Sequence, residues 1–381
     1  MYEFLYIKAL RAAKTIKIKY FRKSLERFNK NLLKTMNDVG WSNKNRDRDY
    51  NDIVLPYWKK YGYAPKKFWF ELNCSRDHHM DPRFIPSDLY YNELLPYINN
   101  LPFCYALQDK CSLDLRFPEV KQAVTVCRRM AGVYYDPEMR VIDCDEALRL
   151  CLNCRNDLFI KPSLYTAAGT GIKVFSPSEN SDDDIRKLFS ETGKNFIVQE
   201  KIIQNDAVMV INPDSVSTIR AVSLFMDNEV YIAHAMLRVG APGRPLVAAD
   251  GGYSVEILED GHLYPKAFLD KGAWVDGSKH GLYDDSTVIP GMERVREAIR
   301  MLHPRIPYFK WIGWDFAIDR SGDPVMIEFN TSPGDDIQRV CGSPLFGDKT
   351  DRILDDYFIY RVMENDQLKG LWSGSEKIRK Y

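Results

Sequence analysis

The sequence predicts an α+β protein with a helical N-terminal region, and three observations lead to this fold class. The chain has 381 residues, 45% hydrophobic and 28% charged, which is enough for two or three domains with a large core. Apolar residues near the N-terminus recur at helical spacing. From about residue 155 onward, short β-type runs follow one another, separated by turn residues and a few helical patterns.

The N-terminal helix is predicted from apolar residues at three- and four-residue steps, namely Ile18, Phe21, Leu25, Phe28 and Leu32. Lys and Arg occupy the other side, and residues 1–34 contain ten of them against two acids. In one interpretation, the apolar stripe packs the helix against the protein body. In the other, the basic amphipathic helix lies on an anionic membrane surface or on a partner.

Overall charge and cysteine usage exclude several classes of protein. Lys+Arg and Asp+Glu both total 53, so no domain-wide basic bias points to nucleic acid, and we expect none as a partner. No run of 18 or more apolar residues predicts a membrane span. Eight scattered cysteines are typical of reduced thiols in a cytosol, and Cys151 and Cys154 lack the further ligands of a zinc site. We expect a cytoplasmic protein, at the inner face of the membrane if the basic helix binds there.

Seven strands are predicted in the second half of the chain, from runs rich in β-branched and aromatic residues. They are DLFIKPS, GIKVFS, NFIVQEKI, STIRAVSLF, VYIAHAMLRVG, WIGWDFAID and PVMIEFN. Helical patterns at residues 183–190 and 291–302 lie between them. Residues 40–105, rich in aromatic residues, Pro and Asn, are expected to form short helices and irregular connections.

The last two runs predict a β-hairpin that turns at Ser321 and Gly322. A turn centred there, without a bulge, places Asp315 directly opposite Glu328 and puts Asn330 on the same face. Two opposed carboxylates in apolar strands repel each other, and a hard divalent cation removes the conflict. The three oxygen donors favour Mg²⁺ over zinc. The alternative is a solvated hairpin face on which the acids have no ligand.

A phosphate-binding loop is a candidate in the stretch FIKPSLYTAAGTGIKVF. It places Lys161 on a strand and then turns through small residues before a second strand. Such a loop lets backbone N–H groups approach a phosphate closely. It is not a P-loop, because no Gly-Lys-Ser/Thr opens a helix after it. The loop residues singled out are Ala168, Gly169, Thr170 and Gly171.

The run NFIVQEKIIQND is a candidate to present backbone groups to a purine edge through residues 199–202, which are Gln199, Glu200, Lys201 and Ile202. Asp206 is then placed to accept ribose hydroxyls. Further along, Arg220 and Arg238 are cations in otherwise apolar strands, which calls for an anionic partner. For each arginine, the alternative is an internal salt bridge to a neighbouring acid.

In this order, the motifs resemble the ATP-grasp superfamily. The set runs from Lys110 in LQDK through FIKP, AAGTGIKVF, QEKI, STIR and MLRVG to the Asp…Glu-x-Asn of the hairpin. The chain most closely resembles the sugar-transfer-associated ATP-grasp family, relatives of the teichuronopeptide-type ligases. STIRAV, LRVG followed by DGGYSVEI, VIPGM and GWDFAID…PVMIEFNTSPG carry that likeness, over roughly residues 105–340. The loop departs from the family pattern where Ala167 and Ala168 replace further glycines.

The resemblance implies two α+β lobes that grip ATP. In such ligases ATP phosphorylates a carboxylate, and an amine attacks the acylphosphate to form an amide. Transferred to matching positions, Lys110 and Lys161 bind phosphates near the adenine, and residues 199–202 form the adenine hinge, with Glu200 near the amino group. Arg220 and Arg238 stabilise the transferring phosphoryl group. The implied ligands of two Mg²⁺ ions are Asp315, Glu328 and Asn330.

These expectations give four parts of the chain. Residues 1–104 form a helical and irregular N-terminal region, and 105–200 a small lobe with the glycine-rich loop. Residues 201–345 form a C-terminal lobe with the metal-binding hairpin, and 346–381 a helical tail.

The expected function is an ATP- and Mg²⁺-dependent carboxylate–amine ligase that modifies a cell-surface polysaccharide or sugar precursor. One alternative is an ATP-grasp kinase that phosphorylates a sugar or small molecule, and another is a non-catalytic nucleotide-binding scaffold. The identities of the sugar-linked carboxylate and the amine, and the oligomeric state, stay open.

Overall fold

The computed structural model describes residues 2–38, 46–164, 169–244 and 251–368, and the chain separates into two units. Unit 1 comprises Met1–Asn100, Lys271–Trp274 and Gly334–Tyr381, and unit 2 comprises Leu101–Asp270 and Val275–Pro333. The two ends of the chain therefore belong to one unit, a long-range association that no local sequence pattern predicts. The four-part division expected from the sequence stays a prediction.

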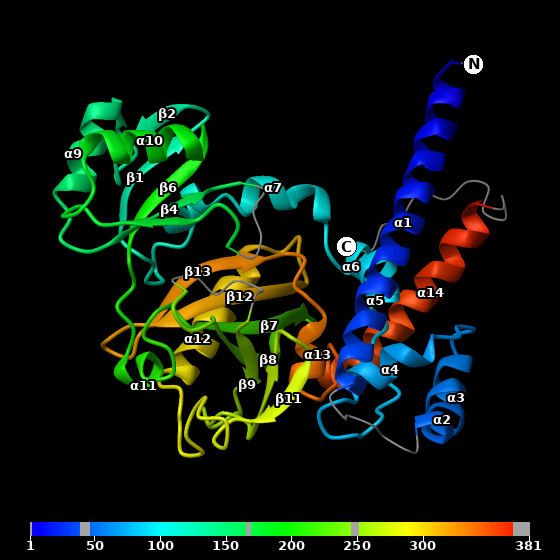
Figure 1. The fold of residues 1–381 in the computed structure, drawn as a ribbon. Coiled ribbons are helices and arrows are strands. Elements are labelled where there is room, and N and C mark those ends of the chain that lie inside the picture. The colour runs from blue at the N-terminus through cyan, green and yellow to red at the C-terminus, as the bar shows by residue number, and fades with distance from the viewer. Residues whose placement is uncertain (1, 39–45, 165–168, 245–250, 369–381) are drawn as a thin grey trace. The chain divides into compact units, whose positions relative to one another are not determined.

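Unit 1 is built from helices (Figure 1). Its longest helices are α1 (Tyr2–Asp38) and α14 (Thr350–Leu368). Trp58 and Trp69 are buried among the shorter ones, and Trp58 Nε1 donates to the carbonyl of Pro82 at 2.8 Å. The short helices expected over residues 40–105 are confirmed for the described part of that range. They are α2 (Arg46–Asp49), α3 (Leu55–Lys59), α4 (Lys67–Asn73), α5 (Ser87–Leu89) and α6 (Leu95–Ile98), joined later by α13 (Asp336–Val340), with π-helical turns at Tyr50–Val54 and Tyr90–Leu94.

Helix α1 packs on unit 1 with a face that overlaps the predicted stripe but is rotated from it, since Phe21 packs edge-to-face on Tyr91 and Leu25 and Leu32 are half-buried. Leu33 and Met36 are buried, whereas Phe28 is 66% exposed, so the prediction that Phe28 belongs to the packing stripe is wrong. Polar contacts accompany this packing: Arg22 pairs with Asp88, and Glu26 with Lys66. A periodicity of apolar residues cannot foresee polar partners that lie far away in the sequence. The side chain of Ile18 lies outside the described residues.

The predicted absence of a membrane span is tested by α1 and α14, since these are the longest helices. Neither they nor any other helix in the described ranges carries a stretch apolar and long enough to cross a bilayer.

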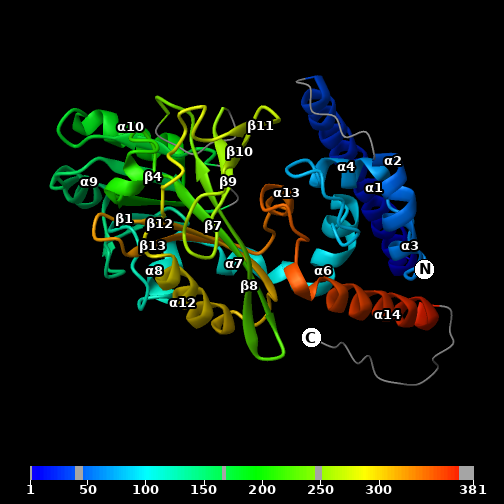
Figure 2. The same ribbon diagram turned by 90° about the horizontal axis from the view of Figure 1, so that it is seen from below.

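Unit 2 contains a six-stranded sheet covered on one face by α9 (Cys144–Leu152) and α10 (Asp182–Thr192) (Figure 2). Leu148 of α9 and Phe189 of α10 pack in one apolar cluster with Phe196 of the sheet. The strand order is β3-β2-β1-β6-β4-β5. The strands are β1 (Thr125–Met130), β2 (Val133–Tyr135), β3 (Val141–Ile142), β4 (Leu158–Pro162), β5 (Lys173–Phe175) and β6 (Phe196–Glu200).

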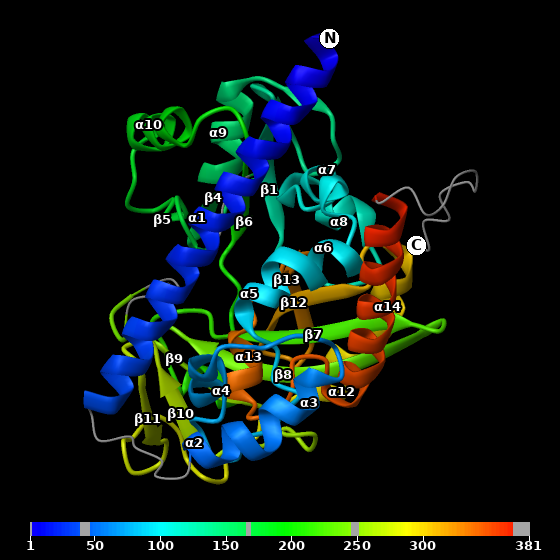
Figure 3. The same ribbon diagram turned by 90° about the vertical axis from the view of Figure 1, so that its right-hand side faces the viewer.

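A seven-stranded sheet carries the second apolar cluster of unit 2, against α12 (Met292–Leu302) (Figure 3). Val295, Ile299 and Leu302 of α12 are fully buried, and each such side chain contributes about 1.5–3 kcal/mol through burial. The order is β11-β10-β9-β8-β7-β12-β13. The strands are β7 (Thr218–Met226), β8 (Glu229–Val239), β9 (Tyr253–Glu256), β10 (Lys266–Leu269), β11 (Ala273–Asp276), β12 (Trp311–Ile318) and β13 (Pro324–Asn330). Unit 2 also contains three short helices: α7 (Cys104–Leu107) and α8 (Leu113–Arg116) precede β1, and α11 (Asp206–Met209) lies between β6 and β7.

All seven predicted strands are confirmed, as β4 to β8, β12 and β13, and the two helical patterns are confirmed as α10 and α12. The strands that the sequence did not predict are short or interrupted by charge. In β1, for example, Arg128 is fully buried and its Nη2 lies 2.6 Å from the Oδ2 of Asp114. Two adjacent arginines in a strand of six residues leave too few apolar positions for a β pattern to be recognised.

Candidate functional site

A row of charged side chains crosses one face of the seven-stranded sheet. Glu328 of β13 pairs in register with Asp315 of β12, and Asp315 pairs on its other side with Arg220 of β7. Directly paired residues of antiparallel strands point to the same face. The neighbours of Asp315, Trp314 and Phe316, point the other way into the core against α12. The alternation of β12 therefore separates the packed face from a polar face.

The predicted pairing of Asp315 with Glu328 is confirmed, although the hairpin is not regular. Near the turn Phe316 pairs with Met326, so Ile327 is an extra residue in β13 between two paired positions. This β-bulge shifts the register by one residue, and the shift brings Glu328 opposite Asp315. The sequence argument assumed a bulge-free hairpin, and it reached the right pair because a slightly displaced turn and the bulge compensate each other.

Both carboxylates of the row already have cationic partners. Arg220 donates to Asp315 through Nε at 2.5 Å and through Nη2 at 2.7 Å, which is the internal salt bridge that the sequence left as an alternative. Lys110 Nζ lies 3.0 Å from Glu328 Oε2. The predicted repulsion between the two acids is therefore relieved by protein cations, and repulsion alone does not demand a metal.

The donor set nevertheless fits a hard cation. Asn330 pairs with Gly313 two residues along from Glu328, so it lies on the same face, and its Nδ2 donates to Asp315 Oδ2 at 3.2 Å. That contact leaves the amide oxygen of Asn330 as a further candidate metal ligand beside the two carboxylates. Mg²⁺ prefers oxygen ligands. Among the described residues, no group of three or more His, Cys, Asp or Glu is arranged to hold a metal. A metal site at this position therefore needs, besides Asp315 and Glu328, the amide oxygen of Asn330 and an oxygen atom of a bound nucleotide or substrate.

Lys110 is held beside this row by the backbone around it. Its own N–H donates to the carbonyl of Ser163, just after β4, at 3.3 Å. Two residues earlier, Gln108 Nε2 donates to the carbonyl of Phe329 in β13 at 3.2 Å. The segment that carries Lys110 thus contacts both sheets of unit 2, which brings a residue of the predicted small lobe to Glu328.

Lys161 is a half-buried cation in the same neighbourhood. Its Nζ donates to Gln199 Oε1 at 3.1 Å, and no carboxylate of a described residue lies within ion-pair distance. Burial lowers the pKa of its ammonium to about 8, and the nearby Lys110 acts in the same direction, while Glu328 opposes it. A half-buried ammonium with no described carboxylate at ion-pair distance favours an anionic ligand.

The predicted glycine-rich loop connects β4 to β5, which pair as an antiparallel hairpin. Gly169 and Gly171 have φ values of 72° and 79°, which glycine adopts without strain. A Cβ on Gly171 would lie 2.9 Å from Cγ of Pro162, so the loop returns close to the strand that carries Lys161. Ala168 lies outside the described residues.

The predicted hinge, residues 199–202, ends β6 and continues beyond it. The N–H of Glu200 donates to the carbonyl of Val124 at 2.9 Å, and the N–H of Lys201 to that of Asp157 at 2.9 Å. The Glu200 carboxylate accepts from Asn156 Nδ2 at 2.8 Å. These N–H groups serve the fold, so an adenine would have to use the remaining backbone groups of this segment, including Ile202. Asp206 is exposed at the start of α11.

Arg238 lies on β8, on the same sheet face as Arg220. Arg220 pairs with Met236, and Arg238 is two residues further along that strand. Arg238 is half-buried, and it forms no ion pair with any described residue. Sequence reasoning missed Glu256 of β9, which pairs with Met236 and so extends the polar face. The signal was present as the acid in the apolar run DGGYSVEI.

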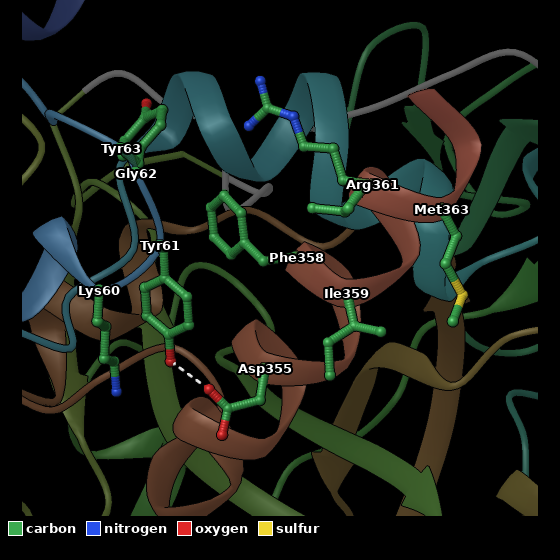
Figure 4. Close-up of a pocket in the computed structure, with 10 residues that line it drawn as sticks. Lys60, Tyr61, Gly62, Tyr63, Asp355, Phe358, Ile359, Arg361 and Met363 are labelled. Atoms are coloured by element: carbon green, nitrogen blue, oxygen red, sulfur yellow. Dashed lines mark hydrogen bonds between the residues drawn. The ribbon is translucent and has the colours of Figure 1, made fainter. Parts of the chain in front are cut away.

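A pocket of about 730 Å³ lies elsewhere, within unit 1, between α14 and the turn after α3 (Figure 4). Tyr61 stacks on Phe358 with ring centroids 4.8 Å apart, and its hydroxyl donates to Asp355 at 2.7 Å. None of the site residues predicted from the sequence lines this pocket. Its location therefore gives no support to the predicted site.

The family profile described as sugar-transfer associated ATP-grasp matches residues 92–352 of this chain. The chain belongs to the sugar-transfer-associated ATP-grasp family. The match covers more than half of the chain and includes every residue that the sequence singled out as a site residue. The resemblance inferred from the motifs, and with it the predicted ATP-grasp fold, is confirmed.

Solved structures show only a distant likeness of fold to this ATP-grasp chain. The VanG D-Ala:D-Ser ligase from Enterococcus faecalis is 16% identical with a TM-score of 0.40, covering 66% of this chain and 61% of its own. A D-alanine–D-alanine ligase from Bacillus anthracis complexed with ATP is 12% identical with a TM-score of 0.36, covering 68% and 66%. The D-cycloserine synthetase DcsG is 12% identical with a TM-score of 0.37, covering 79% and 80%. The chain thus spans less than two thirds of the length of the first two enzymes. Among curated proteins, none matches the chain.

Proposed function

We propose that this ATP-grasp protein is an ATP-dependent ligase that joins a carboxylate to an amine. The observation that carries the proposal is Lys161, a desolvated ammonium with no carboxylate partner in the described residues, beside Lys110 and a glycine-rich turn. Such a cation is stabilised by an anionic ligand such as the phosphates of a nucleotide. Membership of the ATP-grasp family supports ATP as that nucleotide.

In the proposed reaction, a carboxylate oxygen of the first substrate attacks the γ-phosphorus of ATP, and ADP leaves. The nitrogen of the amine then attacks the acyl carbon, phosphate leaves, and the nitrogen loses a proton. Arg220 and Arg238 are proposed to balance the charge of the phosphoryl group during its transfer, since they share one face of the sheet. Positioning and charge neutralisation supply the catalysis, and no side chain acts as a covalent nucleophile.

The proposed metal site uses Asp315, Glu328 and Asn330. When bound, Mg²⁺ would neutralise phosphate charge and hold the phosphates in place. Arg220 and Lys110 pair with these acids here, so a bound cation would take their place as the counter-ion of the carboxylates. Arg220 and Lys110 would then be available to the nucleotide phosphates. Residues 199–202 are proposed to contact the adenine and Asp206 the ribose.

The acceptor is proposed to be a sugar-linked carboxylate in cell-surface polysaccharide biosynthesis, and only the description of the family supports this choice. A cytoplasmic location is also proposed. All eight cysteines are free, and Cys151 lies buried with its Sγ 4.0 Å from that of Cys127. This is typical of a reducing compartment.

Nucleotide binding is tested first, because it needs no knowledge of the substrates. We expect calorimetry to show Mg·ATP binding that Lys161→Met weakens by more than about tenfold. The matched control is Lys173→Met, which removes a lysine of the neighbouring strand whose partner is the exposed Glu191. It should leave the affinity within about twofold. No binding of Mg·ATP by the wild-type protein would favour a scaffold.

The ligase reaction is tested by supplying ATP, a panel of uronic acids and hydroxylamine in place of the amine. A ligase forms ADP and a hydroxamate, because hydroxylamine traps the acylphosphate. With amino acids in place of hydroxylamine, free phosphate and an amide should appear together. A stable phosphorylated product formed without any amine would instead identify a kinase.

A further inference from the structure

Helix α1 carries a line of cations on its solvent side. Lys and Arg recur at steps of four, four, three and four residues, so they lie one above another on a single helical face. All five side chains are exposed. We call this line the basic ridge, and it consists of Lys19, Lys23, Arg27, Lys30 and Lys34. It covers about 22 Å along the helix axis.

The basic ridge has no acid to neutralise it. The only acid between Lys19 and Asn37 is Glu26, which points to the packed side and pairs with Lys66. No member of the ridge forms an ion pair with a carboxylate of the described residues. Arg22, by contrast, is turned inward, where its guanidinium lies 3.8 Å from Asp88 and 3.5 Å from Glu93. The helix therefore turns Arg22 toward the fold and the ridge toward solvent, and within the ridge the ammonium of Lys30 also lies 5.3 Å from the ring centroid of Phe68.

An aromatic side chain accompanies the ridge. Tyr20 is 76% exposed, and Lys23 and Arg27 follow it by three and seven residues, so the three share one side of the helix. An exposed tyrosine beside lysines is suited to the boundary between lipid headgroups and acyl chains, since its ring is apolar and its hydroxyl is polar.

We propose that the basic ridge and Tyr20 bind the surface of an anionic lipid bilayer. Charge complementarity selects this occupant: the whole chain has a net charge of +0, so attraction to an anionic surface has to come from a local cluster. A straight row of cations on one helix face meets a flat surface along its whole length. The chain has no domain-wide basic bias such as nucleic-acid-binding domains carry, which disfavours RNA or DNA as the occupant.

Membrane binding would place the proposed ligase at the bilayer surface, and the membrane-binding proposal does not depend on the ligase activity. A ligase held at a bilayer meets acceptors that are attached to lipid, whereas its nucleotide comes from solution. The ridge belongs to unit 1 and shares no residue with the nucleotide site proposed in unit 2. Loss of membrane binding and loss of nucleotide binding can therefore be measured separately.

The test is sedimentation of the full-length protein with vesicles, without ATP. The probe is a phosphatidylcholine vesicle with or without phosphatidylglycerol. We expect binding only to the anionic vesicles, and weakening by added salt, because salt screens exposed charges beyond roughly 8–10 Å. The ridge variant replaces all five cations by glutamine, which keeps helix propensity, and should lower the partition coefficient by more than about tenfold. Its substitutions are Lys19→Gln, Lys23→Gln, Arg27→Gln, Lys30→Gln and Lys34→Gln.

A matched control removes the same amount of charge from exposed cations elsewhere in the chain. Its substitutions are Lys59→Gln, Lys187→Gln, Lys194→Gln, Arg320→Gln and Lys349→Gln. The control should bind anionic vesicles like the wild type. Equal losses in the two five-site variants would overturn the proposal, because binding would then follow total charge. The proposal is also overturned if the wild-type protein does not bind anionic vesicles. The same holds if the protein still binds RNA at a salt concentration that releases it from the vesicles.

A single substitution guards against a folding defect in the five-site variant. Tyr20→Ser changes one exposed side chain and should reduce vesicle binding severalfold, with an unchanged circular dichroism spectrum and melting temperature. If the Tyr20→Ser protein binds anionic vesicles as tightly as the wild type, Tyr20 is not part of the membrane-binding surface.

Discussion

Arg220 and Asp315 face each other across β7 and β12, and the guanidinium donates to both carboxylate oxygens, at 2.5 and 2.7 Å. The two side chains are only 11% and 7% exposed, so this is a buried bidentate ion pair. Asp315 therefore has a structural partner in the metal-free protein, besides its proposed role as a metal ligand. The sequence argument proposed both acids of the hairpin as metal ligands, and the ion pair adds a structural role for Asp315.

We predict that Asp315→Asn destabilises the metal-free protein by about 3–5 kcal/mol, because it leaves the buried charge of Arg220 uncompensated. Glu328→Gln should cost about 1 kcal/mol or less, since the Glu328 side chain is 27% exposed and its partner Lys110 is anchored independently. Urea unfolding in a chelating buffer measures both. Adding Arg220→Met to Asp315→Asn should recover part of the loss. Equal losses for the two acid variants would contradict the assignment of Asp315 as the structural partner.

Nucleotide affinity is predicted to depend on pH through Lys161. Its pKa is lowered to about 8, so below that pH the ammonium is charged and binds phosphate, and above it the charge is lost. We expect the affinity for metal-free ADP to fall by up to about tenfold per pH unit as pH rises past 8. Calorimetry of the wild type and Lys161→Met, compared across this range, measures the effect. A variant with the same pH slope as the wild type would assign the titration to another group.

The lowered pKa of Lys161 also makes the free energy of unfolding depend on pH. The ordinary pKa of a lysine is 10.5, so between about pH 8 and 10.5 the unfolded chain binds more protons at Lys161 than the folded one. Unfolding free energy should therefore rise with pH in that window through this residue. In Lys161→Met this contribution disappears, and denaturant titrations at pH 8 and pH 10 should show the difference between the two proteins.

His303 should make the fold sensitive to acid. The ring is fully buried, its Nδ1 lies 2.8 Å from Ser223 Oγ, and its Nε2 lies 2.9 Å from the carbonyl of Phe309. The carbonyl of Phe309 can only accept, so Nε2 carries the proton of the neutral ring and Nδ1 accepts from the Ser223 hydroxyl, whose oxygen accepts from Trp314 Nε1 at 2.7 Å. Burial lowers the pKa of His303 from 6.5 to about 4. Its contribution, of about 3 kcal/mol, is complete above pH 6.5 and is lost as pH falls toward 4.

The measurement for His303 is urea unfolding at pH 7 and at pH 4.5, in the wild type and in His303→Gln. The variant should be less stable at pH 7, because glutamine cannot reproduce both ring contacts. The difference in unfolding free energy between the two proteins should be smaller at pH 4.5, because only the wild type has to keep a neutral histidine at position 303. A gap that stays constant with pH would show that the ring does not titrate in this range.

Replacement of Gly171 in the glycine-rich turn is predicted to destabilise the protein. Gly171→Ala places a Cβ 2.9 Å from Cγ of Pro162 at a φ of 79°, so it adds a close contact to backbone strain. The control is Gly193→Ala, at a φ of 93° but with nothing within 4 Å of the new Cβ. The control should cost about 1–3 kcal/mol from strain alone. Gly171→Ala should cost more and should also weaken ATP binding, as melting curves and calorimetry will show.

Much of the fold and of the candidate site follows from local pattern. The seven strands and two helices confirmed by the structure have strong β or helical periodicity, and Asp315 and Glu328 stand out because acids are rare in apolar strands. The strands β1 to β3 and β9 to β11 and the rotation of α1 were not predicted from the sequence. These strands are short or carry charges, such as Arg128 of β1, which pairs with Asp114, and the packed face of α1 includes the pairing of Arg22 with Asp88.

By itself, the sequence determined the family of this protein, its α+β class and the oxygen donors of the hairpin, because these depend on residue order and alternation along the chain. Only the tertiary structure decided what each charge faces. It placed Arg220 against Asp315, Lys110 against Glu328, and left Lys161 without a carboxylate among the described residues. Ion pairing acts over a few ångströms in space, and residues that are distant in the chain meet only after the sheets have formed.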